Sequence, residues 1–110
     1  MKSYMVVGLG RFGSQVAKKL YALGCEVLAI DNNNTNVQQL SNDVTHAVVA
    51  DARDKDVLRA LGAKDFDCAV VAIGDSLADS VLATMNLKEL GGLIFTKPIL
   101  RSGNISSRVL

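Results

Sequence analysis

The sequence predicts an α/β fold built on a doubly wound parallel β-sheet, with helices on both faces of the sheet. Three features of the 110-residue chain lead to this prediction: a glycine-rich turn between an apolar strand and a helix, an acidic residue at the end of the next strand, and a steady alternation of strands and helices. Strands that alternate with helices pair in parallel through right-handed crossovers. We therefore expect three layers, α/β/α, and a sheet of strand order 3-2-1-4-5 that is truncated after its fifth strand.

The glycine-rich turn has the spacing G-x-G-x-x-G, formed by Gly8, Gly10 and Gly13. An apolar strand expected over residues 4–8 precedes it, and an amphipathic helix expected over residues 11–23 follows. In this arrangement the first glycine allows a tight turn, the second lets the backbone approach a phosphate, and the third lets the helix pack closely on the strand. The N-terminus of the helix then offers free N–H groups and a partial positive charge to a diphosphate.

Asp31 follows a second apolar strand, expected over residues 26–30. In Rossmann-like dinucleotide-binding folds an acidic residue at this place, about 20 residues beyond the glycines, accepts hydrogen bonds from the ribose. The next residue is Asn32 and not arginine, so a 2′-phosphate would meet repulsion without compensation. These features favour adenosine nucleotides and NAD(H) over NADP(H). Together with the glycines they form a specific dinucleotide-binding fingerprint.

Caps and apolar runs place the other elements. Asp54 is a suitable N-cap, and Ser76 followed by Asp79 has the spacing of a capping box. In chain order we expect an asparagine-rich turn with a short helix around Val37 and Leu40, a strand over 46–50, a helix over 54–61, an apolar strand over 67–73, a helix over 76–90 and a strand over 93–96. Residues 1–97 then form one nucleotide-binding domain, and residues 98–110 form an irregular C-terminal tail.

Size and composition limit the classes of function. A chain of 110 residues suits one compact domain, and its formal net charge of +1 gives no electrostatic reason to expect nucleic acid as a partner. No apolar run approaches the roughly 18 residues of a membrane helix, and no secretory signal is recognisable. Cys25 and Cys68 lack a metal-ligand spacing, so we interpret them as reduced thiols of a cytoplasmic protein.

Candidate binding residues lie after the third and fourth strands, because ligands of an open parallel sheet bind beyond the carboxyl ends of its strands. Asp51 and Ala52 are placed to border an adenine, although Asp51 could equally start the following helix. Gly74 should line the middle of the cleft. The Arg11 side chain could meet a phosphate of its own ligand or of a neighbouring subunit's ligand, or it could be a solvated arginine on the helix face.

The sequence offers little for catalysis. Its only histidine, His46, lies at the start of the third strand, away from the ligand end of the sheet. No Cys/His pair, carboxylate dyad or metal-ligand cluster can be assembled from the chain. We therefore expect a protein that is not an enzyme, in which the nucleotide acts as a signal and not as a reactant.

Several of these segments together resemble the nucleotide-binding N-terminal lobe of RCK (KTN) domains, which are regulatory subunits of Trk/Ktr-type potassium uptake systems and gating domains of potassium channels. The similarity runs over residues 4–97. The glycine-rich turn matches that of the family with Arg11 and Phe12 included, which dehydrogenases need not have. The other matching segments are residues 24–31, Asp51 and Ala52 followed by Val57 and Leu58, residues 69–75, and residues 87–91.

The resemblance implies that the domain binds ATP, ADP or NAD(H), forms a homodimer or a larger ring, and controls a potassium-translocating membrane subunit from the cytoplasmic side. It implies these ligand contacts: Gly10, Arg11, Phe12 and Gly13 at the phosphates, Asp31 at the ribose, Asp51 and Ala52 near the adenine, Gly74 in the cleft, and Lys97 at a basic position after the fifth strand. From Pro98 onward the sequence resembles neither the sixth strand nor the crossover helix of the family, so we expect a fragment or a shortened form. Two alternatives remain open: the NAD-binding half of an oxidoreductase, and an interaction module that binds no nucleotide.

Overall fold

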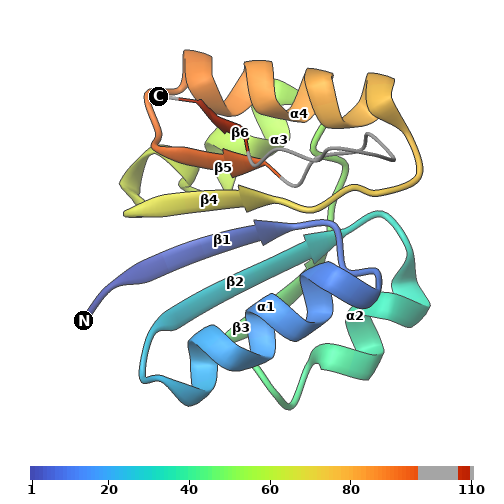
Figure 1. Ribbon diagram of the computed structural model, residues 1–110, viewed down its shortest axis with the longest axis vertical. Coiled ribbons are helices and arrows are strands. Elements are labelled where there is room, and N and C mark those ends of the chain that lie inside the picture. The colour runs from blue at the N-terminus through green and yellow to red at the C-terminus, as the bar shows by residue number, and fades with distance from the viewer. Residues whose placement is uncertain (97–106, 110) are drawn as a thin grey trace.

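The computed structural model describes residues 1–96 and 107–109. One sheet forms the middle of the molecule, with helices on both of its faces (Figure 1). The elements are β1 (Ser3–Val7), α1 (Arg11–Ala22), β2 (Glu26–Asp31), α2 (Asn34–Leu40), β3 (His46–Val49), α3 (Lys55–Ala60), the 3₁₀ turn η1 (Ala63–Asp65), β4 (Cys68–Val71), α4 (Leu77–Glu89), β5 (Ile94–Thr96) and β6 (Ser107–Val109).

The sheet has the strand order β3-β2-β1-β4-β5-β6. Its first five strands are parallel, which confirms the predicted fold class and the order 3-2-1-4-5. β1 lies at the centre, where Val7 pairs with Ile30 of β2 and with Val71 of β4. The order reverses between β1 and β4, so the chain leaves these two strands toward opposite faces and an opening forms beyond their carboxyl ends.

A short sixth strand is an element that the sequence does not predict. β6 runs antiparallel to β5, with Arg108 opposite Phe95, inside the tail 98–110 for which no regular element is expected. An edge strand such as β5 presents unpaired N–H and C=O groups, which another segment can satisfy. A strand of three residues carries too little alternation of apolar and polar side chains to be recognised in a sequence. The tail residues 98–106 and 110 lie outside the described part of the chain.

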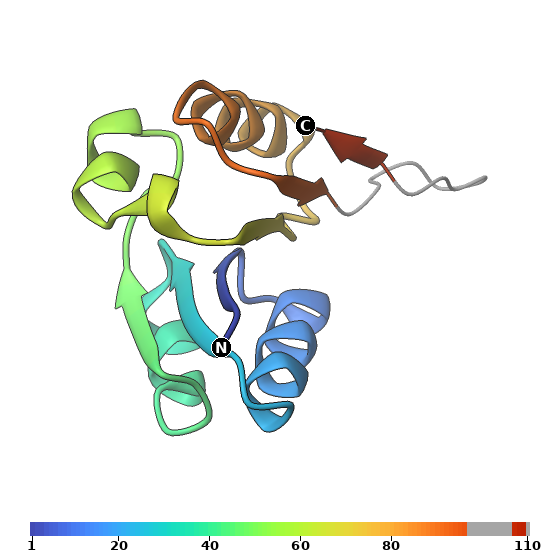
Figure 2. The ribbon, with the colours of Figure 1, turned by 90° about the vertical axis from the view of Figure 1, so that its left-hand side faces the viewer.

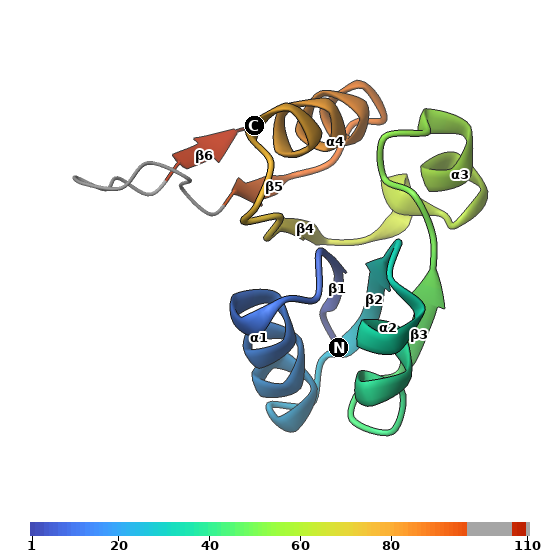
Figure 3. The same ribbon diagram turned by 90° about the vertical axis from the view of Figure 1, so that its right-hand side faces the viewer.

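Alternate residues of the strands pack against helices on opposite faces of the sheet. On β1, Met5 and Val7 join the core beneath α3 and α4, whereas Val6 joins the core beneath α1 and α2. Figures 2 and 3 show this division from two sides: α1 and α2 lie along β1–β3, and α3 and α4 lie together near β4. Because both faces are covered, the central strands are apolar on both sides.

Two glycines of the glycine-rich turn are required by packing. Gly8 has a φ of 96°, which L side chains rarely adopt, and a Cβ there would lie 2.9 Å from the carbonyl carbon of Ala72. A Cβ on Gly13 would overlap the carbonyl oxygen of Gly8. The close approach of α1 to the end of β1 therefore depends on both glycines, as predicted.

The helices α3 and α4 begin with side-chain caps. Asp54 accepts hydrogen bonds from the backbone N–H groups of Asp56 and Val57 at the start of α3, and Ser76 accepts one from Asp79 at the start of α4. Both N-caps are the predicted ones. In the part of the chain that the structure describes, no helix has both the length and the apolar character that crossing a membrane requires.

Candidate functional site

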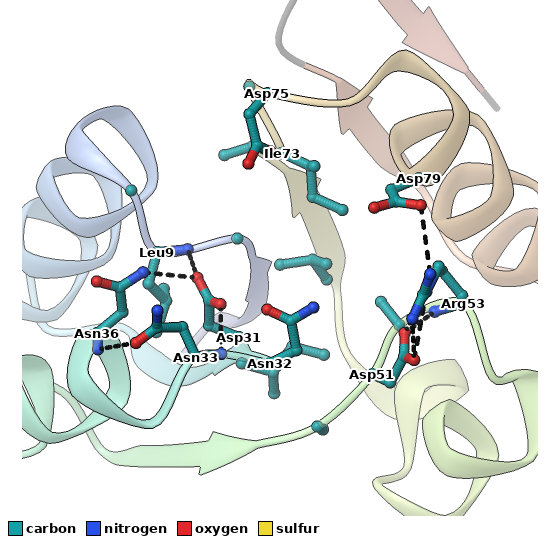
Figure 4. Close-up of a pocket in the computed structure, with 18 residues that line it drawn as sticks. Leu9, Asp31, Asn32, Asn33, Asn36, Asp51, Arg53, Ile73, Asp75 and Asp79 are labelled. Atoms are coloured by element: carbon teal, nitrogen blue, oxygen red, sulfur yellow. Dashed lines mark hydrogen bonds and ion pairs between the residues drawn. The ribbon is translucent and has the colours of Figure 1, made fainter.

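A cleft of about 500 Å³ opens beyond the carboxyl ends of β1, β2, β3 and β4. Figure 4 shows its lining residues, with the glycine-rich turn and Asp31 on one side and the loop after β3 on the other. The volume lies within the usual range of small-molecule sites, about 300–1,000 Å³. The predicted site residues that line the cleft are Gly8, Gly10, Asp31, Asn32, Asp51, Ala52 and Gly74.

The other predicted site residues do not line this cleft. Arg11 lines a smaller hollow of about 310 Å³ beside the glycine-rich turn. Gly13 packs against Gly8, and the Phe12 side chain, 44% exposed, lies outside the cleft lining. Lys97 lies outside the described residues.

The glycine-rich turn presents an uncapped N-terminus of α1 to the cleft. Gly10 is the N-cap residue, and no side chain caps the helix or places an acidic group in its first turn. A Cβ on Gly10 would meet no protein atom within 4 Å, and its φ of −72° is accessible to any L residue. Neither packing nor backbone conformation requires glycine here, and the missing side chain leaves the backbone open to close approach from the cleft.

The Asp31 carboxylate ties the end of β2 to the glycine-rich turn and to α2. Its Oδ2 accepts hydrogen bonds from the Leu9 N–H at 2.7 Å and from Nδ2 of Asn36 at 3.3 Å (Figure 4). Its Oδ1 accepts one from the Asn33 N–H at 2.8 Å. These donors hold the carboxylate in place and offset its charge, and a sugar hydroxyl in the cleft can donate to the lone pairs that remain.

An arginine that the sequence analysis missed forms the opposite wall of the cleft. Nη2 and Nε of Arg53 donate hydrogen bonds to the two carboxylate oxygens of Asp51 at 2.8 and 3.0 Å, and Nη1 lies 3.7 Å from Oδ1 of Asp79 on α4. The side-chain hydrogen bond from Arg53 holds the pKa of the Asp51 carboxyl below its ordinary value and raises the pKa of Arg53. Asp51 thus lines the cleft, and the N-cap of α3 is Asp54.

Two asparagines also position the walls. Asn36 holds Asp31 from α2, and Asn86 of α4 donates from Nδ2 to the carbonyl oxygens of Ala52 and Arg53 at 3.1 and 3.0 Å. The asparagine-rich stretch 32–36 is visible in the sequence, but as turn and cap material. Asn86 meets residues more than 30 positions away in the chain, so no local pattern could have indicated its role.

The fold and the cleft define a Rossmann-like domain whose cleft lies where the strand order reverses. A comparison with protein families then identifies the particular family. The TrkA-N domain matches residues 4–104, and the chain belongs to this family.

Two curated relatives are potassium uptake proteins of Bacillus subtilis (strain 168). Ktr system potassium uptake protein C is 43% identical over 90 residues, which are 82% of this chain and 41% of that protein. Ktr system potassium uptake protein A is 44% identical over 89 residues, 81% of this chain and 40% of that protein. The chain therefore spans about two fifths of the length of these relatives.

Among solved structures, the Kef CTD of Shewanella denitrificans in AMP-bound form superposes with a TM-score of 0.71 and 28% identity, over 86% of this chain and 58% of that chain. The NAD(P)-binding domain of an exopolyphosphatase-related protein from Archaeoglobus fulgidus has a TM-score of 0.73 at 22% identity, over 86% of this chain and 72% of that chain. At that identity the second likeness supports the fold alone.

Proposed function

We propose that this chain is the nucleotide-sensing part of a regulatory subunit of a potassium uptake system. The TrkA-N family and the two potassium uptake relatives support this class of function. The observation that most directly supports nucleotide binding is the uncapped N-terminus of α1 at Gly10. Gly10 lines the same cleft as the anchored Asp31 carboxylate. The ligand is an adenine nucleotide: ATP, ADP, NAD⁺ or NADH.

The cleft offers a place for each part of an adenosine diphosphate group. The phosphates bind the backbone of the glycine-rich turn at Gly10, where the helix dipole favours negative charge. The ribose donates hydrogen bonds to Asp31, and the adenine lies near Asp51 and Ala52, with Gly74 between the two walls. The AMP-bound form of the similar Kef domain supports an adenosine ligand.

The partner is a potassium-translocating membrane subunit, which the domain binds from the cytoplasmic side together with further copies of its own chain. The names of the relatives support this partner. The nucleotide acts as a signal in this proposal, and the arrangement is consistent with that role because His46 begins β3, at the end of the sheet opposite the cleft.

Isothermal titration calorimetry with ATP, ADP, NAD⁺ and NADH tests the proposal. We expect binding of at least one of these ligands at one site per chain. Absence of binding of all four at millimolar concentration would overturn the proposal. Binding of NAD⁺ or NADH without ATP or ADP would favour the oxidoreductase alternative, which rests on the fold alone.

A further inference from the structure

A second hollow, of about 310 Å³, lies beside the cleft between α1 and α2. The two cavities share part of their walls, because Leu9, Gly10 and Asn36 line both. The smaller hollow is therefore a side chamber of the cleft, on the outer side of the glycine-rich turn.

The walls of the side chamber are cationic and polar. Arg11, Ser14 and Lys18 of α1 line one wall, at spacings of three and four residues that place them on one face of the helix. Gln39 of α2 lies on the other wall, and no carboxylate belongs to the lining. Among the described residues neither Arg11 nor Lys18 forms an ion pair, so both charges are available to an anion.

Asp31 marks the junction between the cleft and the side chamber. Its Oδ2 accepts hydrogen bonds from Leu9 and Asn36, two of the residues that line both cavities. A ribose bound at Asp31, as proposed above, therefore lies at the entrance to the side chamber.

The covalent structure of the ligand decides which hydroxyl faces that entrance. C3′ adjoins C4′, which carries the 5′-phosphate arm, so the 3′-oxygen is the ribose hydroxyl nearer the phosphates and the glycine-rich turn. C2′ adjoins the carbon that carries the base. Asn32, on the other side of Asp31 from Leu9 and Asn36 (Figure 4), lines only the cleft. The side chamber thus opens toward the 3′-oxygen.

We infer that the side chamber is a subsite for a 3′-phosphate, and that the domain takes 3′-phosphorylated adenosine 5′-nucleotides more tightly than their unsubstituted counterparts. Arg11 and Lys18 bind the added phosphate through charge-assisted hydrogen bonds, with Ser14 as a neutral donor. The hydrogen bonds that Asp31 accepts from Leu9, Asn33 and Asn36 reduce its repulsion of the phosphate. The inference rests on the proposed function, since it requires an adenosine nucleotide in the cleft.

Calorimetry with adenosine 5′-monophosphate, adenosine 3′,5′-bisphosphate and adenosine 2′,5′-bisphosphate tests this inference on the full chain. We expect the 3′,5′-bisphosphate to bind about tenfold more tightly than the monophosphate, and the advantage to shrink at high salt. Lys18→Gln and Arg11→Gln should each bring the ratio of the two affinities, bisphosphate to monophosphate, most of the way down to one. Lys19→Gln makes the same charge change one residue along α1, outside the chamber lining, and should keep the full ratio.

Several outcomes would overturn the inference: equal affinity for the monophosphate and the 3′,5′-bisphosphate, an equal or larger gain with the 2′-isomer, or an unchanged ratio in Lys18→Gln. Inorganic phosphate that binds at Lys18 while nucleotide fills the cleft would show a free anion site and would overturn it as well. If the monophosphate binds and the 3′,5′-bisphosphate binds no more tightly, the inference fails and the proposed function stands. If no adenosine nucleotide binds, the proposed function fails with it.

Discussion

At the scale of the residue, Asp31 both anchors the glycine-rich turn and lines the cleft. We predict that Asp31→Ala lowers the free energy of unfolding by about 1–3 kcal/mol, since the Leu9 N–H and Asn36 lose a charged acceptor. We also predict that it weakens nucleotide binding. Urea unfolding and calorimetry measure the two effects separately.

Asp43→Ala is a matched control for the loss of one negative charge, because Asp43 is exposed and lies outside the cleft lining. It should change neither stability nor affinity appreciably. If Asp31→Ala left nucleotide affinity at the level of this control, the ribose contact would be wrong and the interaction-module alternative would gain support.

Arg53 sets the ionisation of Asp51 on the other wall of the cleft. The folded pKa of Asp51 lies below 3.8, so its ionised form contributes stability at higher pH that is lost as the pH falls through the folded pKa. Arg53→Gln should raise the pKa of Asp51 toward 3.8 and make stability less dependent on pH below that value. A carboxyl carbon NMR titration measures the shift. Arg59→Gln, which breaks only the Asp56 pair on α3, should leave Asp51 unchanged.

At the scale of the element, the start of α1 holds one glycine that packing requires, Gly13, and one that it does not, Gly10. Gly13→Ala should destabilise the fold by about 2–4 kcal/mol, because the new Cβ overlaps the Gly8 carbonyl oxygen and pushes α1 away from β1. Gly10→Ala should cost less than about 1 kcal/mol, since its Cβ enters open space. It should nevertheless weaken nucleotide binding. Thermal unfolding and calorimetry of both variants measure this contrast, and similar loss of stability in the two would contradict it.

The elements themselves were largely predictable, because caps and apolar periodicity act over a few residues. The caps at Asp54 and Ser76 were predicted from such patterns. The order of the five parallel strands was predicted from the alternation of strands and helices. The strand β6 was not predicted, because its pairing with β5 depends on an open sheet edge and not on a pattern within residues 107–109.

At the scale of the whole molecule, the cleft joins the two parts of the sheet. One wall comes from β1, the glycine-rich turn, β2 and α2, and the other from the loop after β3, the segment after β4 and α4. A nucleotide that touches both walls should stabilise the complete fold by about 2.7 kcal/mol at 100 times its Kd, which raises Tm by about 10 °C. Differential scanning calorimetry measures this increase. Gly10→Ala at the same ligand concentration should show a smaller increase, and an equal one would place the ligand outside this cleft.

The sequence by itself determined the class of fold, the positions of the glycines and Asp31, and the strand ends that line the cleft. These features depend on neighbours along the chain, where spacing and residue type are sufficient evidence. Only the tertiary structure decided which side chains meet: Arg53 with Asp79, Asn86 with the loop after β3, and Arg11 in the side chamber and not in the cleft. The reason is physical, because these contacts join residues that are brought together only when the helices pack on the sheet.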